Sequence, residues 1–307
     1  MRIVFLGTSA FACPALRALA KAHDVALIIT QPDRPAGRKR ELHPSAVKNA
    51  SLDLGLRVAQ PEKINSEGGI SLLRDAAPEA IVVASYGQFL STKVFSLPPR
   101  GTVNIHASLL PRYRGAAPIN WAIIRGETET GVTTFFIEKG MDSGEILVQR
   151  SCLIGSDETA GELHDRLATL GAEAILDTLC SIEDGTAHPT PQRKEDATLA
   201  PKLSRADGEM DWTKSAREIH NLVRGLNPWP GAFTHLGGET VKIHRTALTG
   251  IGHGRIEPRI IALQETGRLL VGTTDELIEI LEIQREGRPR TTGKAFLNGL
   301  RGDSHFN

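Results

Sequence analysis

The stretch IVFLGTSAFACPALRALAKAHDVALII, residues 3–29, decides the fold class. It opens with a β-branched and aromatic run, Ile3–Leu6, that is bounded by a glycine. Alanine and leucine then recur at helical spacing over residues 12–20, and a second apolar run, Val25–Ile29, follows. This spacing predicts a helix with one apolar face, and the two runs predict strands that are covered on both faces. A strand, a helix and a strand within about 30 residues form a βαβ unit, which predicts a parallel sheet.

The same alternation continues along the chain and predicts one large α/β domain. Further strands are expected at residues 80–84, 102–106, 133–137 and 146–148, and further helices at residues 46–54, 119–125 and 160–179. The sequence therefore predicts an α/β fold with a Rossmann-like, mostly parallel sheet that carries helices on both faces.

The composition changes after residue 188, where three prolines and many charged residues predict a linker over residues 189–206. One amphipathic helix is expected at residues 215–226, and short strands separated by glycine turns follow it. These strands are expected at residues 232–236, 240–244, 268–271 and 277–283. We therefore predict a catalytic domain at residues 1–188 and a smaller C-terminal β-barrel domain, OB-like, at residues 207–307.

Composition excludes several classes of protein. The chain has 307 residues with 36 Lys+Arg and 36 Asp+Glu, so its zero net charge excludes a uniformly basic nucleic-acid coat but not a local basic patch. No apolar run approaches the roughly 18 residues that a membrane span needs. Three scattered cysteines argue against a disulfide framework or a zinc site. We expect a cytoplasmic monomer that does not attach to membranes.

Several cofactor motifs are absent. Gly7–Phe11 follows the first strand but has one glycine where a dinucleotide fingerprint needs three, so an ordinary strand-to-helix turn is favoured over NAD binding. Gly287–Lys294 has five residues between its glycines, and an alanine follows the lysine, so it is not a phosphate-binding P-loop. HExxH and GxSxG motifs do not occur. The sequence therefore predicts a protein that needs no metal and no ATP.

The most informative polar stretch, Asn104–Pro118, begins inside a predicted strand. Asn104 and His106 point to the same side, because side chains alternate along a strand. They stand near the carboxyl end of a parallel strand, where open α/β sheets bind ligands. An amide donor beside an imidazole suits the stabilisation of an oxyanion together with the transfer of a proton. Polar groups that satisfy the following loop would show the same spacing, so both interpretations stand.

Two other segments are candidates for function. Gly140–Gly144 holds one carboxylate, Asp142, between glycines, as an active-site loop or an ordinary turn would. Residues 34–48 carry five basic residues and one acidic residue, a net charge of +4, directly after the second strand. A basic loop at the carboxyl edge of the sheet is well placed to meet phosphate groups, although most charge runs are solvated surface.

Together these segments resemble the methionyl-tRNA formyltransferase family over nearly the whole chain and in order. The resemblance is carried by Phe5–Thr8, Phe11–Ala12, Gln31–Arg38, Ala84–Gly87, Asn104–Pro118, Gly131–Thr133, Met141–Gly144 and Asn227–Pro230. The Asn-x-His-x-Ser-Leu-Leu-Pro signature with a downstream aspartate belongs to formyltransferases in general, whereas the segments Gln31–Arg38 and Asn227–Pro230 are more specific to the tRNA enzymes. Ala107 stands where the family usually has glycine, and Ser9 where it often has proline.

The resemblance implies an enzyme that transfers a formyl group from 10-formyltetrahydrofolate to the α-amino group of methionyl initiator tRNA, and so supports translation initiation. It implies no metal and no ATP. The catalytic residues it implies are Asn104, His106 and Asp142. The folate-contacting residues it implies are Gln88, Phe89, Leu90, Ser108, Leu109, Leu110 and Pro111. The tRNA-contacting residues it implies are Arg34, Arg38, Lys39 and Arg40, with further support from the C-terminal domain.

Two other functions remain as alternatives at this point. A sugar-nucleotide N-formyltransferase would share the three catalytic residues, but the basic segment and Asn227–Pro230 disfavour it. An RNA-binding module on an inert α/β scaffold would leave the coincidence of Asn104, His106 and Asp142 unexplained.

Overall fold

The structure is a computed structural model that describes residues 1–36, 41–252, 257, 261–263, 267–300, 305 and 306. The chain divides into two compact units. The first unit comprises Met1–Gly115, Thr130–Cys152 and His164–Leu199. The second comprises Ala116–Glu129, Leu153–Leu163 and Ala200–Asn307. Of the described helices, none combines the length and apolarity that a membrane crossing requires.

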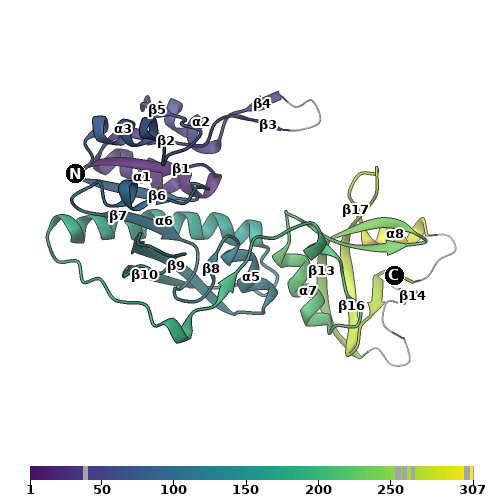
Figure 1. Ribbon diagram of the computed structural model, residues 1–307. Helices are drawn as coiled ribbons and strands as arrows, with labels where there is room; N and C mark the ends of the chain where they lie inside the picture. The colour runs from purple at the N-terminus through teal and green to yellow at the C-terminus, as the bar shows by residue number, and fades with distance from the viewer. Residues whose placement is uncertain (37–40, 253–256, 258–260, 264–266, 301–304, 307) are drawn as a thin grey trace. The chain divides into compact units, whose positions relative to one another are not determined.

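The first unit is built on a seven-stranded sheet in the order β10-β9-β7-β6-β1-β2-β5 (Figure 1). Its strands are β1 (Arg2–Gly7), β2 (Asp24–Ile29), β5 (Val58–Ala59), β6 (Ala80–Ala84), β7 (Thr102–His106), β9 (Glu129–Phe136) and β10 (Ile146–Leu153). The pairs β1–β2, β1–β6, β6–β7 and β2–β5 are parallel, whereas β7–β9 is antiparallel. The predicted mostly parallel sheet is therefore confirmed.

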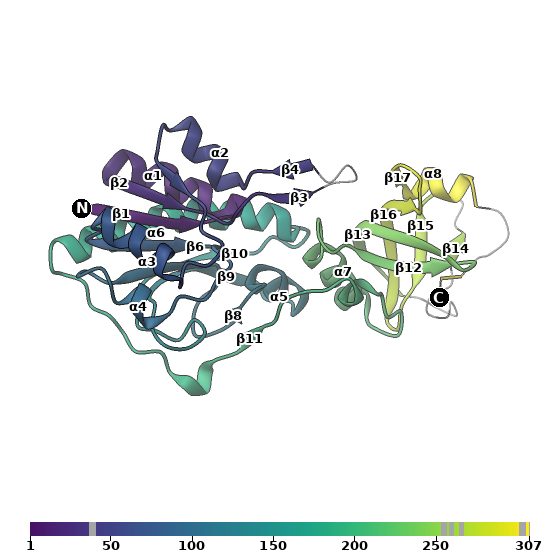
Figure 2. The same ribbon diagram turned by 45° about the horizontal axis from the view of Figure 1, so that its top comes forward.

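Helices cover both faces of this sheet, as predicted (Figures 1 and 2). They are α1 (Cys13–Ala22), α2 (Ala46–Asp53), α3 (Glu67–Ala76), α4 (Thr92–Phe95) and α6 (Ala160–Glu183). Val4 and Leu6 of β1 pack with Leu73 of α3 and Val94 of α4 on one face. On the other face, α6 comes so close to β7 that a Cβ at Gly171 would crowd the Ile105 side chain.

Three segments of the first unit have a structure that the sequence pattern did not predict. Helices α3 and α4 and the short strand β5 fill the interval between residues 54 and 96. After β2, the strands β3 (Arg34–Ala36) and β4 (Glu41–His43) pair as an antiparallel hairpin. Residues 189–199, predicted as linker, belong to the first unit, and β11 (Leu199–Ala200) pairs with β8 (Arg114–Gly115).

The second unit contains an antiparallel sheet in the order β12-β13-β16-β15-β14, with β17 paired to β16. Its strands are β12 (Ala232–Leu236), β13 (Glu239–Gly252), β14 (Ile261–Leu263), β15 (Leu269–Gly272), β16 (Glu276–Arg285) and β17 (Thr291–Thr292). The four predicted strands are thus confirmed. Among the described residues the pairing does not join β12 to β14, so the closed barrel remains a prediction.

Three described α-helices lie wholly within this unit: α5 (Pro118–Ile124), α7 (Ala216–Gly225) and α8 (Gly293–Asn298). Helix α7 begins at a capping box, in which Ser215 Oγ accepts from the Glu218 amide and the Glu218 carboxylate accepts from the Ser215 amide. Its apolar face joins a core in which the Trp212 and Phe306 rings stack 5.4 Å apart.

Candidate active site

Strand β7 presents Asn104 and His106 on one side of the sheet at its carboxyl end. Asn104 pairs with Val83 of β6 and with Phe135 of β9, and His106 pairs with Thr133 of β9. Because side chains alternate along a strand, Ile105 faces α6 and its two polar neighbours face the opposite side. The predicted placement of the two residues is therefore confirmed.

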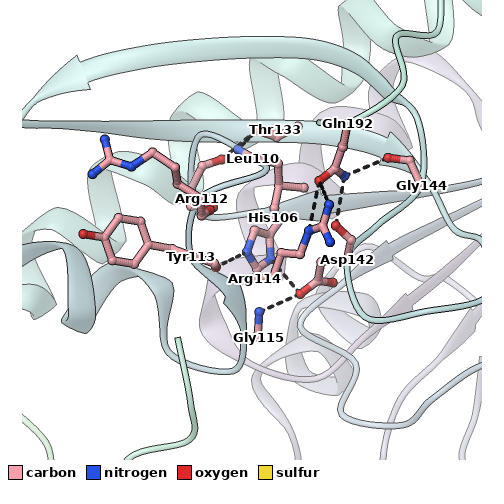
Figure 3. Close-up of polar contacts among 11 residues, drawn as sticks. His106, Leu110, Arg112, Tyr113, Arg114, Gly115, Thr133, Asp142, Gly144 and Gln192 are labelled. Atoms are coloured by element: carbon pink, nitrogen blue, oxygen red, sulfur yellow. Dashed lines mark hydrogen bonds and ion pairs between the residues drawn. The ribbon is translucent and has the colours of Figure 1, made fainter. Parts of the chain in front are cut away.

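The His106 ring is buried, with 6% of its surface exposed, and its two nitrogens have different surroundings (Figure 3). Nε2 lies 2.9 Å from the carbonyl oxygen of Tyr113. A carbonyl only accepts, so Nε2 carries the proton and Nδ1 carries the lone pair of the neutral ring. Nδ1 faces the Asp142 carboxylate at 3.8 Å, which is an ion-pair distance for a protonated ring but too long for a direct hydrogen bond.

Asp142 lies in the turn between β9 and β10 and has a left-handed backbone, with φ of 47°. Aspartate is one of the few residues with a side chain that tolerate this conformation. The turn allows little variation, since a Cβ at Gly144 would overlap the carbonyl of Phe136. Asp142 Oδ2 accepts a hydrogen bond of 2.8 Å from the Gly115 amide, which fixes the carboxylate beside His106. The structure therefore brings together the two residues that chain distance separates.

Asn104, the third predicted catalytic residue, lies two residues before His106 on the same side of β7. It is half-buried, and its amide has no hydrogen-bond partner among the described residues. Polar groups that merely satisfied the following loop would be engaged with it, as His106 Nε2 is. The free amide can instead donate to an oxygen that develops negative charge.

The loop after β7 is held by Thr133, a buried residue of β9 to which the sequence assigned no role. Its hydroxyl donates to the Ser108 carbonyl at 2.6 Å and accepts from the Leu110 amide at 3.1 Å. The Gln149 amide donates to the same hydroxyl and to the Leu110 carbonyl. In the sequence, Thr133 was visible as a polar residue at the start of a predicted strand and as part of the segment Gly131–Thr133 that carries the family resemblance. The Ser108 side chain is also buried, and its hydroxyl donates to the Arg112 carbonyl, so it shapes the loop.

The other predicted folate-contacting residues have varied surroundings. Leu110 is buried, whereas Leu109 and Pro111 are half-buried. After β6, the Gln88 amide donates to the Glu62 carbonyl and accepts from the Ile64 amide. Leu90 packs against the core, whereas 78% of the Phe89 surface is exposed. Of these side chains, Phe89 has the most exposed apolar surface.

Of the predicted tRNA-contacting residues, the structure describes Arg34, which lies on β3. Arg38, Lys39 and Arg40 lie outside the described residues, and Arg34 forms an exposed ion pair of 3.1 Å with Glu62. The base of the hairpin is anchored through Asp33, which pairs with the Lys48 ammonium at 2.5 Å and accepts from the Gln60 amide at 2.7 Å. The hydrogen bond from Lys48, and then that from Gln60, lowers the pKa of Asp33 below its usual value.

Two further polar residues beside the His106–Asp142 pair were not predicted. Arg114, the residue before the amide that binds Asp142, donates from Nε and Nη2 to the Gln192 side chain (Figure 3). The Gln192 amide in turn donates to the carbonyls of Asp142 and Gly144. No local pattern marked Gln192, which lies in the proline-rich segment predicted as linker.

Two family models match the chain. The model described as formyl transferase matches residues 1–179, and the model described as formyl transferase, C-terminal domain, matches residues 202–301. Among solved structures, the chain resembles the sugar 3N-formyl transferase WlaRD with a TM-score of 0.69 over 94% of this chain and 99% of that one, at 18% identity. HypX from Aquifex aeolicus in complex with tetrahydrofolic acid gives a TM-score of 0.64 over 97% of this chain and 47% of that one, also at 18% identity. Because the sequence identity is only 18%, these two structural similarities show a shared fold and nothing more.

Relatives found by sequence have a much higher identity to this chain than these two structures have. The methionyl-tRNA formyltransferase of Solibacter usitatus is 46% identical over 306 residues, which cover 98% of this chain and 96% of that protein. The methionyl-tRNA formyltransferase of Geobacter metallireducens is 45% identical over 305 residues, which cover 98% of this chain and 96% of that protein. Both matches extend through the two units, so the chain belongs to the methionyl-tRNA formyltransferase family.

Proposed function

We propose that the protein transfers a formyl group from 10-formyltetrahydrofolate to the α-amino group of methionyl initiator tRNA, in the cytoplasm, for translation initiation. One observation carries the proposal. At the carboxyl end of β7, the lone pair of His106 Nδ1 faces the Asp142 carboxylate, and Asn104, on the same side of the strand, has a side-chain amide without a hydrogen-bond partner among the described residues. A proton acceptor, a charge that stabilises its protonated form and an oxyanion donor are the groups that acyl transfer needs.

The reaction follows from these groups. The α-amino group has a pKa of about 7.7–8.0, so a useful fraction is a free nucleophile near neutral pH. Its nitrogen attacks the formyl carbon, the new C–N bond forms, and negative charge develops on the formyl oxygen, to which the Asn104 amide donates. His106 Nδ1 accepts the proton that the amine loses, and Asp142 stabilises the resulting imidazolium across 3.8 Å. The bond from the formyl carbon to the folate nitrogen then breaks, and the proton passes to that nitrogen.

This assignment refines the roles that the sequence suggests for His106. Because the Tyr113 carbonyl engages Nε2–H, the neutral His106 ring offers only the acceptor Nδ1 to the reactants. The hydrogen bond to the oxyanion therefore comes from the Asn104 amide. The backbone carbonyl of Tyr113 orients the ring, and Asp142 supplies charge. No step of this proposal requires a metal or ATP, because the formyl group is already activated in the donor and the protein positions the reactants.

We assign folate binding to Leu109–Pro111 and Gln88–Leu90, with Ser108 as the residue that shapes the first of these segments. The two segments follow the neighbouring strands β7 and β6, and the carboxyl ends of parallel strands are the usual ligand-binding edge of an open sheet. The exposed ring of Phe89 offers apolar surface to the flat ring system of the donor.

We assign tRNA binding to Arg34, Arg38, Lys39 and Arg40 and to the C-terminal domain at residues 207–307. In the second unit, Arg285 and Arg288 line a hollow of about 230 Å³, and the Arg285 guanidinium lies 5.1 Å from the centre of the Phe296 ring. Guanidinium groups beside a concave surface suit phosphate contacts, which supply most of the affinity for a nucleic acid.

The proposal is tested by offering 10-formyltetrahydrofolate with one of two acceptors, methionyl initiator tRNA or an amino-sugar nucleotide. We expect formylmethionyl-tRNA and no formylated sugar, with uncharged tRNA as the inactive control. Formylation of the amino sugar alone would establish the sugar-nucleotide alternative, and binding of tRNA without any transfer would establish the RNA-binding module.

The assignment of the basic segment has its own test in Arg38→Ala. We expect weaker use of methionyl-tRNA, unchanged folate affinity, and a salt dependence of tRNA binding that is flatter by about 0.7–0.9 for each phosphate that Arg38 neutralises. The measurement is a salt series of tRNA binding with folate affinity determined in parallel. An unchanged slope together with unchanged tRNA kinetics contradicts the assignment.

A further inference from the structure

The Gln192 side chain makes four hydrogen bonds beside the candidate active site, all within the first unit (Figure 3). Its amide oxygen accepts from Arg114 Nε at 3.1 Å and from Arg114 Nη2 at 2.6 Å. Its amide nitrogen donates to the Asp142 carbonyl at 2.9 Å and to the Gly144 carbonyl at 2.8 Å. One uncharged side chain thereby joins the loop that follows β7 to the turn that carries the carboxylate.

The chemistry of its partners fixes which way this amide points. A guanidinium has only donors, so the oxygen must face Arg114, and carbonyls only accept, so the nitrogen must face Asp142 and Gly144. Glutamate has the same shape but would place a carboxylate oxygen against the two carbonyls, which repel it. Leucine has a similar volume and would make neither set of bonds. Glutamine therefore satisfies both sides at once.

The segment that carries Gln192 is fixed to the loop after β7 by backbone contacts as well. The Tyr113 amide donates to Thr198 Oγ1, and the Arg114 amide donates to the Thr198 carbonyl, each at 2.8 Å. Tyr113 supplies the carbonyl that binds His106 Nε2, and Gly115 supplies the amide that binds Asp142. The segment at residues 192–200 thus holds the backbone groups that orient both catalytic side chains.

We propose that Gln192 is a positioning residue for formyl transfer, which sets the Asp142 turn at its working distance from His106 and anchors the Arg114 guanidinium beside it. This inference rests on the proposed function, because it assigns Gln192 a role in the same site. Gln192 acts through the turn that carries Asp142. Its two hydrogen bonds to the Asp142 and Gly144 carbonyls hold the left-handed backbone of that turn in place. Misplacement of a reacting group by about 1 Å can cost roughly 100-fold in rate, so removal of these hydrogen bonds should lower kcat.

The experiment compares Gln192→Leu and Gln192→Glu with Arg193→Leu as the matched control, since Arg193 is the next residue and its side chain is 72% exposed. We expect kcat to fall about 10–100-fold in both Gln192 variants, with KM for folate and for methionyl-tRNA within about threefold of the wild type. Thermal melting shows whether each variant is folded. Because glutamate keeps the acceptor for Arg114, a residue that only anchors Arg114 or only supports the fold would tolerate Gln192→Glu, and wild-type turnover in that variant overturns the proposal.

The test is completed with the double variant that combines Gln192→Leu and Asp142→Asn. Its rate of formyl transfer is measured in single turnovers with enzyme in excess. If Gln192 works through Asp142, adding Gln192→Leu to Asp142→Asn lowers the remaining rate by less than about twofold, because the two changes remove the same interaction. A full additional loss overturns the proposal.

Absence of transfer by the wild type would instead count against the proposed function. Hydrogen exchange over residues 140–144 then decides the inference on its own. Faster exchange in Gln192→Leu than in the wild type supports the positioning role, and equal exchange overturns it.

Discussion

Two buried histidines, His106 in the first unit and His220 in the second, resemble each other until their second nitrogen is considered. Each donates from Nε2 to a backbone carbonyl, that of Tyr113 for His106 and that of Ser156 for His220. His220 Nδ1 then accepts from the Thr246 hydroxyl at 2.9 Å. Among the described residues, His106 Nδ1 has no hydrogen-bond partner and lies 3.8 Å from the Asp142 carboxylate.

The difference indicates which of the two rings can take up a proton in the proposed reaction. Both nitrogens of His220 are engaged and burial lowers its pKa, so the ring remains neutral and supports packing. His106 keeps an unengaged lone pair next to a carboxylate, which would stabilise the ring once protonated. Burial alone therefore does not distinguish the two histidines, whereas an unengaged ring nitrogen that faces a carboxylate is the feature on which the proposed role of His106 depends.

The largest effect should come from His106→Ala, which removes the proton acceptor. We expect turnover to fall at least about 100-fold, the lower end of what one acid–base group contributes, and Asp142→Asn to act in the same direction. The measurement is kcat with methionyl-tRNA, on protein whose thermal melting shows that it is folded. Near-normal turnover in either variant would show that the substituted residue has no part in the mechanism. His106 and His220 would then not differ in function as proposed.

Thr133→Val tests a residue that pairs with His106 across the sheet and resembles His220 in its bonding. The Thr133 hydroxyl, like both ring nitrogens of His220, is fully hydrogen-bonded. The substitution keeps the shape but leaves the Ser108 carbonyl and the Leu110 amide without their partner, so we expect the free energy of unfolding to fall by about 2–4 kcal/mol. Urea unfolding measures the change, and Thr133→Ser, which keeps the hydroxyl, is the control. Equal losses in both variants would mean that the methyl group, and not the hydroxyl, supports the loop.

His220→Leu should leave chemistry intact and cost stability. The Thr246 hydroxyl and the Ser156 carbonyl lose their partner, and we expect about 1–2 kcal/mol less stability. Turnover per folded molecule should remain within about twofold of the wild type, because no group that the mechanism uses is changed. A loss of activity as large as that of His106→Ala would show that His220 is not merely structural.

The smallest effect concerns pH. Burial lowers the pKa of His220 below its usual value of 6.5, so the unfolded chain takes up a proton before the folded protein does. The stability that neutral His220 contributes is therefore present above about pH 6.5 and is lost as pH falls below that value. Unfolding free energies measured between pH 8 and pH 5 should decline less steeply in His220→Leu than in the wild type. Some decline should remain, because burial also lowers the pKa of His23 and His244.

The sequence predicted those parts of the molecule that depend on local pattern. The apolar runs gave the parallel strands, and the alternation of side chains placed Asn104 and His106 on one side of β7. The place of Asp142 beside them came from the family resemblance, since spacing does not indicate which turn meets which strand. Its left-handed backbone and its bond to Gly115 became visible only in the structure.

The rest depended on contacts between distant segments. Gln192 lies among prolines and charges, a composition typical of linkers, but the carbonyl it binds at Asp142 is 50 residues away. Thr133 looks like any β-branched strand residue until the loop after β7 folds over its hydroxyl. The β3–β4 hairpin was missed because its strands are short and Pro35 in β3 disfavours a strand except at an edge.

The left-handed backbone at Asp142 also limits how this site can change in evolution. The conformation is tolerated by aspartate, asparagine and glycine and penalised for other residues, by about 1–2 kcal/mol per residue in general. A single base change in an aspartate codon leads to either asparagine or glycine, and each would preserve the turn while removing the carboxylate. The backbone of the turn therefore tolerates loss of the charge, and under the proposed mechanism selection for formyl transfer is what maintains it. Descendants of such a chain that lose activity would be expected to keep an intact turn at residue 142.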